Sequence, residues 1–366
     1  MVTNLERTFK SGTEMSARSQ KMSLNSITRR GALVTGSAGL LFACSGRPDS
    51  SAETSPKTPL WRAGPALPFA AQEIYPALHK GKIHLAGGFV SNGETISGTT
   101  DRHVILDTQT GEWNDATPLP IARHHPNLIS YQDRLLAIGG FEARSEDAVW
   151  IMQTGVWAFD GKTWSDAPAL PQPNGESVLG ILGDTLHTCG GRKPSGSSNA
   201  SWNNHTDISD HFVLTGLDGA WEAAAPLPTA RNSAAAAIIG SNWHMVGGRT
   251  VSGGNTPVHE VYDANEDRWR TAAPMPQGQG GLAAASVGGK LYAFGGEFFD
   301  NGGGVYPEAW FYAPASDSWE AIPDMPHPRH GLGAVAVENE IYLIGGALEV
   351  GGRKTSDLVE IFTPSA

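Results

Sequence analysis

Short apolar runs that end in a pair of glycines recur along the chain from residue 60 to residue 366. Each run is about five residues long, the usual length of a strand. No segment in this range has the 3.6-residue apolar period of a long helix. Glycines (45) and prolines (24) are frequent, as expected where short strands are joined by tight turns. We therefore predict an all-β domain over residues 60–366.

The apolar runs belong to a repeat. A pair of glycines occurs at intervals of 48 to 57 residues, at Gly87-Gly88, Gly139-Gly140, Gly190-Gly191, Gly247-Gly248, Gly295-Gly296 and Gly345-Gly346. A tryptophan follows five of these pairs, at Trp113, Trp164, Trp221, Trp269 and Trp319, and a proline-rich corner comes soon after each tryptophan. Self-similarity of this period indicates a repeat architecture.

These units resemble the kelch repeat. The matching features are the strand ending in Gly-Gly, an aromatic-Asp pair such as Tyr262-Asp263, the tryptophan, and an arginine after the proline corner. The resemblance covers Leu60–Pro364 and implies a β-propeller whose blades are small four-stranded sheets. One such sheet cannot bury its own faces, so the blades stack around an axis. We expect the tryptophans to pack between blades.

The two ends of the repeat region predict the blade count. No tryptophan strand follows Gly346, whereas Leu60–Pro68 has the sequence of such a strand. Trp61 stands 52 residues before Trp113, in register with the other repeats. We therefore expect a six-bladed kelch β-propeller closed by an N-terminal outer strand.

Residues 1–44 have the features of an export signal. Arg29-Arg30 precede an uncharged run, Gly31–Ala43, that is too short to span a bilayer. The segment resembles a twin-arginine signal, and Leu41–Cys44 resembles a bacterial lipobox with Cys44 as the lipidated residue. An ordinary cleaved signal is the alternative, and either Met1 or Met22 is the start. Residues 45–59 are polar and read as a flexible tether. We expect a protein of the periplasm or cell envelope whose only membrane contact is a lipid anchor.

The net charge is −11, and it becomes −15 without the basic first 43 residues. Such an acidic body repels phosphate backbones, so nucleic-acid binding is not predicted. The other cysteine, Cys189, lies in an apolar run and reads as a small buried side chain.

Two sets of six repeat positions are predicted to surround one mouth of the central channel. The first set follows the glycine pairs and consists of Phe89, Phe141, Arg192, Arg249, Glu297 and Ala347. The second set begins the inner strands and consists of Glu73, His125, Glu176, Ser233, Gly281 and Gly331, with His124, Asn232 and His330 beside it. Polar side chains on blades 1 to 3 would face glycines, and hence open space, on blades 5 and 6. Such a site suits a small polar ligand.

Three consensus arginines, Arg123, Arg231 and Arg329, leave two roles open: ligand binding or bracing of neighbouring blades. Trp202, in the long loop 192–211, either stacks on a sugar ring or anchors its loop. Glu73, His125 and Glu176, or His205, Asp207 and His211, have metal-ligating side chains. Neither set has diagnostic spacing, so no metal or cofactor is predicted.

Two functions follow from these residues. The first is an interaction module that binds a small polar ligand, such as a sugar, or an envelope protein. The second is a sugar epimerase. An exported kelch propeller of six blades resembles the N-acetylneuraminate epimerase (sialic acid mutarotase) family. That resemblance implies catalytic roles for Glu297, which follows a glycine pair, and for Arg249 or Arg329 from a neighbouring blade.

Overall fold

The computed structural model describes residues 60–365, and its architecture is all-β, as predicted. Within these residues the only helical segments are two 3-10 turns, at Trp202–Asn204 and Asp300–Gly302. No helix in this part of the chain is long and apolar enough to cross a bilayer. The predicted export signal and tether, including Cys44, lie outside the described residues.

The described residues form six four-stranded antiparallel sheets. From the innermost strand outward, the sheets consist of β3 (Ala77–His79), β4 (Lys82–Ala86), β7 (His103–Asp107), β8 (Glu112–Ala116); β9 (Asn127–Tyr131), β10 (Arg134–Ile138), β13 (Val156–Phe159), β14 (Trp164–Ala167); β15 (Val178–Leu182), β16 (Thr185–Cys189), β19 (His211–Leu214), β20 (Glu222–Ala223); β21 (Ala235–Ile239), β22 (Asn242–Val246), β23 (His259–Asp263), β24 (Arg268–Thr271); β25 (Ala283–Val287), β26 (Lys290–Phe294), β29 (Ala309–Ala313), β30 (Ser318–Ile322); β31 (Gly333–Val337), β32 (Glu340–Ile344), β33 (Val359–Phe362), β1 (Trp61–Ala63).

Smaller sheets follow four of the glycine pairs. They are β2 (Ala71–Gln72), β5 (Phe89–Ser91) and β6 (Ile96–Thr99); β11 (Phe141–Glu142) and β12 (Ile151–Met152); β17 (Arg192–Pro194) and β18 (His205–Asp207); β27 (Glu297–Phe298) and β28 (Gly304–Val305). These hairpins carry four members of the first predicted ring.

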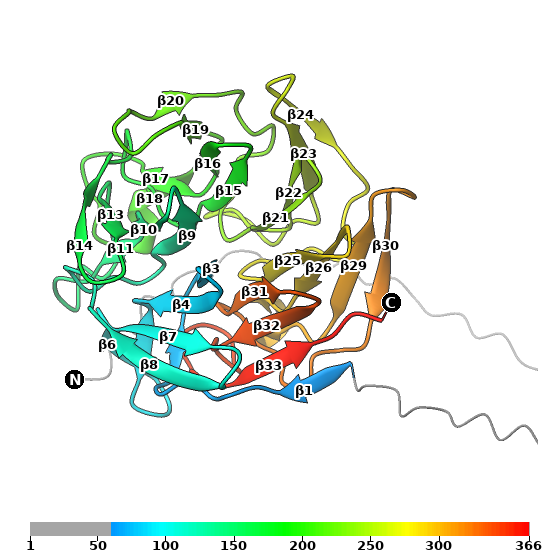
Figure 1. Ribbon diagram of the computed structural model, residues 1–366, viewed down its shortest axis with the longest axis horizontal. Coiled ribbons are helices and arrows are strands. Elements are labelled where there is room, and N and C mark those ends of the chain that lie inside the picture. Colours follow the sequence, from blue (N-terminus) through cyan, green and yellow to red (C-terminus); the bar gives the residue numbers. More distant parts are fainter. Residues whose placement is uncertain (1–59, 366) are drawn as a thin grey trace, which may run out of the picture. The chain divides into compact units, whose positions relative to one another are not determined.

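The six large sheets stand around a common centre (Figure 1). Their innermost strands contact one another in the order β3, β9, β15, β21, β25, β31 and back to β3. Apolar clusters fill the spaces between adjacent sheets; one of them joins Ile83 and Leu85 of β4 to Tyr342 and Ile344 of β32. Each sheet therefore buries both faces against its neighbours.

The N-terminal strand β1 pairs with β33, with Trp61 opposite Phe362. It also takes part in a hydrogen bond that recurs in every sheet. The indole N–H of each outer tryptophan donates to a backbone carbonyl of the preceding sheet: Trp61 to Pro323, Trp113 to Pro65, Trp164 to Thr117, Trp221 to Pro168, Trp269 to Ala225 and Trp319 to Ala273. The tryptophans thus lie between neighbouring sheets, as predicted.

Buried histidine pairs form hydrogen bonds between adjacent strands in three of the sheets. In each pair the Nδ1–H of the first ring donates to Nε2 of the second, 2.9 to 3.0 Å away, in the pairs His84–His103, His187–His211 and His244–His259. Burial lowers the pKa of His84 and His244 to about 3, and that of His103, His187 and His259 to about 4. These rings are therefore neutral at neutral pH.

The histidine pairs predict acid lability. Their folded-state pKa values lie below the value of about 6.5 that unfolded histidine has, so the unfolded chain binds more protons. Stability is complete above about pH 6.5 and is lost as the pH falls towards 4, by up to about 1.4 kcal/mol per pH unit for each histidine. We expect the double variant His244→Gln/His259→Gln, measured by urea unfolding at several pH values, to lose stability less steeply on acidification. A double variant with the slope of the natural protein would contradict this explanation.

Candidate functional site

The second predicted ring lies at the centre of the sheets, in an unusual backbone conformation. All six positions have positive φ: Glu73 (55°), His125 (56°), Glu176 (56°), Ser233 (50°), Gly281 (70°) and Gly331 (58°). Backbone hydrogen bonds link neighbours around this ring; for example, the N–H of Glu73 donates to Gly331 O at 2.7 Å. Four of these residues have side chains that normally avoid this region, and such strain is commonly stored at functional sites.

The first ring lies directly against the second. Backbone bridges join Arg192 to Gly175, Arg249 to Asn232, and Glu297 to Gly280. Each of these partners immediately precedes a member of the second ring. The residues that follow the glycine pairs are therefore neighbours of the residues that begin the inner strands, as the repeat register predicts.

Glu176 is held on three sides. The Arg192 guanidinium forms an ion pair with its Oε2 atom, and the Ser233 hydroxyl donates to its Oε1 atom at 3.0 Å. His125 Nε2 lies 3.4 Å from Oε1. Although burial alone would raise the pKa of Glu176, the nearby Arg192 and His125 lower it. Glu176 is therefore a carboxylate.

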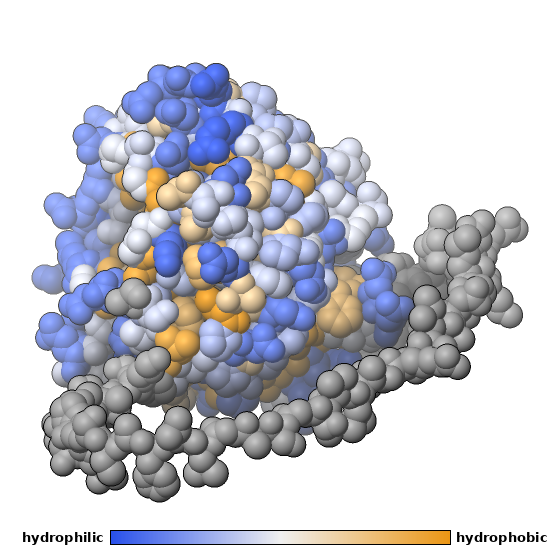
Figure 2. Space-filling model, turned by 90° about the vertical axis from the view of Figure 1, so that its right-hand side faces the viewer, coloured by the Kyte–Doolittle hydropathy of each residue, from blue (hydrophilic) through white to orange (hydrophobic). Residues whose placement is uncertain are grey.

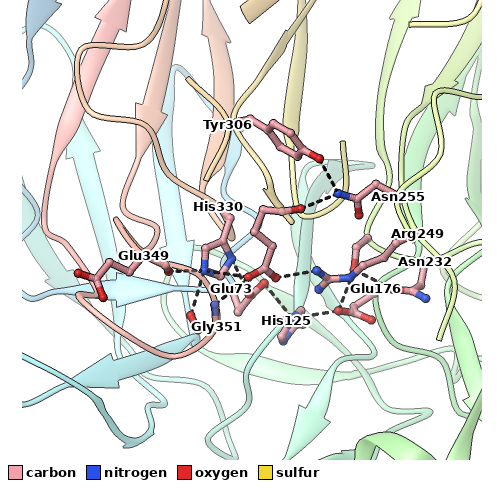
Figure 3. Close-up of polar contacts among 12 residues, drawn as sticks. Glu73, His125, Glu176, Asn232, Arg249, Asn255, Tyr306, His330, Glu349 and Gly351 are labelled. Atoms are coloured by element: carbon pink, nitrogen blue, oxygen red, sulfur yellow. Dashed lines mark hydrogen bonds and ion pairs between the residues drawn. The ribbon is translucent and has the colours of Figure 1, made fainter. Parts of the chain in front are cut away.

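Glu73 lies between two histidines (Figure 3). His125 Nε2 is 2.9 Å from Glu73 Oε2, and His330 Nδ1 is 3.5 Å from Oε1. Burial would raise the pKa of Glu73, but the two histidines hold it well below its usual range. Burial lowers and the facing carboxylates raise the pKa of both His125 and His330, with a net increase. These two imidazoles therefore carry protons more readily than free histidine.

Glu297 lies beside Arg249, the Gly351 N–H and His330. Its Oε1 accepts from Arg249 Nη1 at 2.6 Å, and its Oε2 accepts from the Gly351 N–H at 2.8 Å. His330 Nε2 is 3.5 Å from Oε2. Burial would lower the pKa of Arg249, but the negative charges of Glu297 and the other carboxylates outweigh this effect and raise that pKa.

Seven side chains, six of them buried and Glu73 partly buried, thus form a series of alternating charge, which we call the charge cluster. Its members, in spatial order, are Arg192, Glu176, His125, Glu73, His330, Glu297 and Arg249. Five of them, Glu73, His125, Glu176, Arg249 and His330, are labelled in Figure 3, where they converge on one region.

His124 contacts the charge cluster through His125. Its Nε2–H donates to Val149 O at 2.9 Å, so its Nδ1 accepts the proton of His125 Nδ1 at 2.6 Å. Its ring stacks on Phe89 and Phe141, and burial lowers its pKa well below the usual value. A neutral His124 therefore fixes the ring of His125, while the other nitrogen of His125 faces the carboxylates.

Two arginines stand at the ends of the charge cluster beside Trp202. The guanidinium carbon is 3.5 Å from the Trp202 ring centre for Arg192 and 5.5 Å for Arg249. Among the described residues, the Nη1 and Nη2 atoms of Arg192 and the Nε atom of Arg249 have no hydrogen-bond partner. Asp207, opposite Arg192 in the register, accepts instead from Asn232 and from the Val251 N–H. Buried guanidinium donors without acceptors are uncommon, because leaving them unpaired costs free energy.

Comparison with known proteins identifies the repeat. The profile of the Kelch motif family matches residues 280–326. Kelch-like protein terF of Aspergillus terreus is 27% identical over 216 residues, which make up 57% of this chain and 45% of that protein. Kelch-like protein 35 of Mus musculus is 32% identical over 170 residues, or 44% of this chain and 27% of that protein. The chain thus carries a kelch motif at residues 280–326 and is similar to kelch-like proteins over part of its length.

The chain spans less than half the length of these two curated relatives. A solved structure, that of YjhT, matches the fold with a TM-score of 0.69 and 17% sequence identity. The match covers 82% of this chain and 97% of YjhT. At this identity the similarity supports a shared β-propeller fold and carries no argument about activity.

The consensus arginines of the kelch repeat lie apart from the charge cluster. Arg231 donates to Gly247 O and pairs with Glu260, and Arg329 donates to Gly345 O and pairs with Glu360. Arg123 donates to Gly139 O and lies over the Trp157 ring. Each arginine thus holds the carbonyl of the first glycine of a pair. Of the two roles left open, the structure favours bracing over ligand binding.

The open space predicted at Gly281 and Gly331 is present at Gly281 but not at Gly331. A Cβ atom on Gly331 would lie 2.7 Å from the carboxyl group of Glu73, so this side chain occupies the space. A Cβ atom on Gly281 would meet nothing closer than 3.8 Å. The expectation of open space was therefore wrong at Gly331, because Glu73 reaches across to His330.

These two glycines form a matched pair for mutation. Alanine at either position costs about 1–2 kcal/mol for its left-handed backbone. Gly331→Ala also displaces Glu73, which adds about 1–3 kcal/mol of overpacking. We expect urea unfolding to show a larger loss for Gly331→Ala than for Gly281→Ala. Equal losses would mean that Glu73 does not occupy this space in solution.

The two groups of metal-ligating residues considered from the sequence differ from the group that the fold brings together. His211 bonds to His187 and to Ala225 O, in a sheet, so it does not join His205 and Asp207. The described side chains whose ligand atoms do come within 4.8 Å of one another are Glu73, Glu297 and His330. Spacing in the sequence could not show this set, because its members come from three different repeats.

Cys189 is free and buried, and burial raises the pKa of its thiol strongly. It is therefore a packing residue, as predicted. Trp202 covers Arg192 and lies edge-to-face against Trp150, at 5.3 Å between ring centres, so it anchors its loop over the charge cluster.

Proposed function

We propose that this kelch protein binds a small organic anion, such as a sugar acid, between Arg192 and Arg249. The single observation that carries the proposal is the set of buried guanidinium N–H groups without acceptors at this point. A carboxylate matches the planar fork of arginine and would accept from two of its donors at once. The ligand's charge would thereby continue the alternation of the charge cluster.

The surroundings fit such a ligand. Trp202 covers the two arginines with its indole ring. The arginines are already buried and oriented by Glu176 and Glu297, so little order has to be gained on binding. Preorganised donors of this kind give affinity and orientation together.

The architecture that holds the site is part of the proposal. The six large sheets would be the six blades of one ring, closed where β1 completes the sheet of β33. The circular contacts of the inner strands and the recurring tryptophan hydrogen bond, including that of Trp61, support this arrangement. A closed ring keeps residues from six sheets in a fixed geometry.

We propose that the protein is exported and binds its ligand in the periplasm or cell envelope. The twin-arginine-like segment at Arg29-Arg30 and the lipobox-like Cys44 support a periplasmic or envelope protein with a lipid anchor. Fractionation of cells that express the full chain, or a chain lacking residues 1–44, tests this location. Recovery of both proteins from the same soluble cytoplasmic fraction would overturn it.

A sugar epimerase is the second candidate. It is favoured by the contact between Arg249 and Glu297, because this arginine from the neighbouring sheet supplies the cation that the loop after Glu297 lacks. In that role Glu297 would move a proton at the anomeric centre and Arg249 would hold the acid group of the sugar. Turnover of an acidic sugar that Glu297→Gln abolishes would establish the enzyme.

A protein partner at the channel mouth has less support. An interaction surface usually gathers large exposed apolar side chains. In the described residues these are Leu78, Ile121 and Phe299, and Phe299 is the only aromatic one. On the flank drawn in Figure 2, hydrophobic areas are small and lie between hydrophilic ones. The buried charge cluster therefore argues for a small ligand.

A thermal-shift screen of acidic and neutral sugars tests the main proposal. We expect at least one acidic sugar to raise the unfolding midpoint, and its neutral counterpart to leave it unchanged. A screen in which no small carboxylate shifts the midpoint would overturn the proposal.

A further inference from the structure

Glu73, Glu297 and His330 bring one ligand atom each within 4.8 Å of one another at the heart of the charge cluster. Glu297 and His330 are buried, at 2% and 1% exposed, and the Glu73 side chain is 13% exposed. The Nδ1 atom of His330 has no hydrogen-bond partner among the described residues. A buried imidazole nitrogen that makes no hydrogen bond and lies 3.5 Å from Glu73 Oε1 is an independent sign that an ion is bound there.

The tautomer of His330 follows from its other nitrogen. Nε2 lies 2.9 Å from Gly351 O and 3.1 Å from Glu349 O, and a carbonyl can only accept. Nε2 therefore carries a proton and donates it to the backbone. A metal ion that displaces the second proton of the ring would therefore bind at Nδ1, while Nε2–H keeps its bond to the backbone, as in most metal-binding histidines.

The carboxylates are also oriented by neighbours. His125 holds Glu73 through Oε2, which leaves Oε1 on the side of His330. Arg249 and the Gly351 N–H hold Glu297. Supporting hydrogen bonds of this kind fix the ligands of a metal site before the ion arrives.

The distance between Glu73 Oε1 and His330 Nδ1 fits a shared ion. The two atoms are 3.5 Å apart. Two ligands of a tetrahedral ion, each about 2.1 Å from it, are separated by about 3.4 Å. Glu73 and His330 therefore need almost no movement to bind one ion. A carboxylate oxygen of Glu297, within 4.8 Å of the other two ligand atoms, would move toward the ion.

We infer that Glu73, Glu297 and His330 form a binding site for a divalent first-row metal ion, with open positions for water or a ligand oxygen. One imidazole and two carboxylates suit Zn²⁺ or Mn²⁺ better than Ca²⁺, which prefers oxygen ligands alone. The inference goes beyond the proposed anion binding, which uses Arg192 and Arg249. It also changes the role of Glu297, since a carboxylate that ligates an ion is not a free base.

The test measures bound metal in the full chain. Protein stripped with EDTA is dialysed against Zn²⁺ or Mn²⁺, and the ion is quantified by mass spectrometry, with the electron paramagnetic resonance spectrum of Mn²⁺ as a second readout. We expect one ion per chain in the natural protein and in the control Glu142→Gln, whose carboxylate lies in another hairpin. Glu73→Gln and His330→Gln are expected to weaken binding at least about 10-fold.

The outcomes separate the two proposals. Absence of a bound ion in the natural protein, or equal binding by Glu73→Gln and the control, would overturn the metal site. Glu73→Gln keeps the side-chain shape, so it decides the matter even if His330→Gln fails to fold. Acidic sugars are titrated into the EDTA-treated protein in parallel. Sugar binding without metal uptake would refute the metal site alone, and metal uptake without sugar binding would refute the anion site alone.

Discussion

Arg231→Met is expected to destabilise the protein by about 3–5 kcal/mol, because it removes one partner of a buried ion pair. The Arg231 side chain is fully buried and bonds to Glu260 Oε2 at 2.5 Å. It also donates to Gly247 O and Met245 O, and so joins the glycine pair to its own strand. Without it, the buried Glu260 carboxylate would keep only the Thr229 hydroxyl as a partner.

Chemical denaturation measures this loss, and two further variants show its cause. Arg231→Met/Glu260→Gln is expected to recover most of the stability, since no charge remains unpaired. Arg123→Met should cost less than Arg231→Met, because Arg123 lies over Trp157 and bonds to carbonyls without a carboxylate partner. If the double variant is no more stable than Arg231→Met alone, the buried charge is not the reason for the loss.

Arg192→Gln is expected to weaken binding of an acidic sugar by roughly 10- to 100-fold, the effect of losing hydrogen bonds between charged groups. The Nη1 and Nη2 atoms of Arg192 are the unpartnered donors on which the anion site depends. The same substitution leaves Glu176 without its cation. Affinity is therefore measured by calorimetry at a temperature at which the variant is shown to be folded.

Two controls accompany Arg192→Gln. Arg192→Gln/Glu176→Gln removes the unpaired carboxylate and should bind as weakly as Arg192→Gln. Arg144→Gln, at an exposed ion pair with Glu142, should bind as tightly as the natural protein. Undiminished affinity of both Arg192 variants would place the anion elsewhere.

The fold could be predicted because its signals repeat. The glycine pairs and the tryptophans recur at equivalent points of the repeats, so a position in one repeat predicts its equivalents in the others. The pairing of Trp61 with Phe362 was predictable in the same way, because the missing outer strand stands at the other end of the repeat region. The repeat register thus links local sequence to its long-range partner.

The candidate site was predicted as a set of positions but not as contacts. Register places Glu73, His125 and Glu176 at equivalent points around one centre, and the structure gives all three the same positive φ. Which charges pair depends on side-chain reach, so the filling of Gly331 by Glu73 could not be read from the repeat. Nor could the Gly351 N–H, a backbone donor from a loop, be recognised as a partner of Glu297.

The central claim is that the buried arginines of the charge cluster bind an anion. One calorimetric comparison tests this claim most directly. An acidic sugar found by the thermal screen is titrated into the natural protein beside its methyl ester, which has nearly the same shape and no charge. The account predicts that the acid binds and that the ester binds at least about 10-fold more weakly, since it cannot form charge-assisted hydrogen bonds. Equal affinity for acid and ester would contradict it.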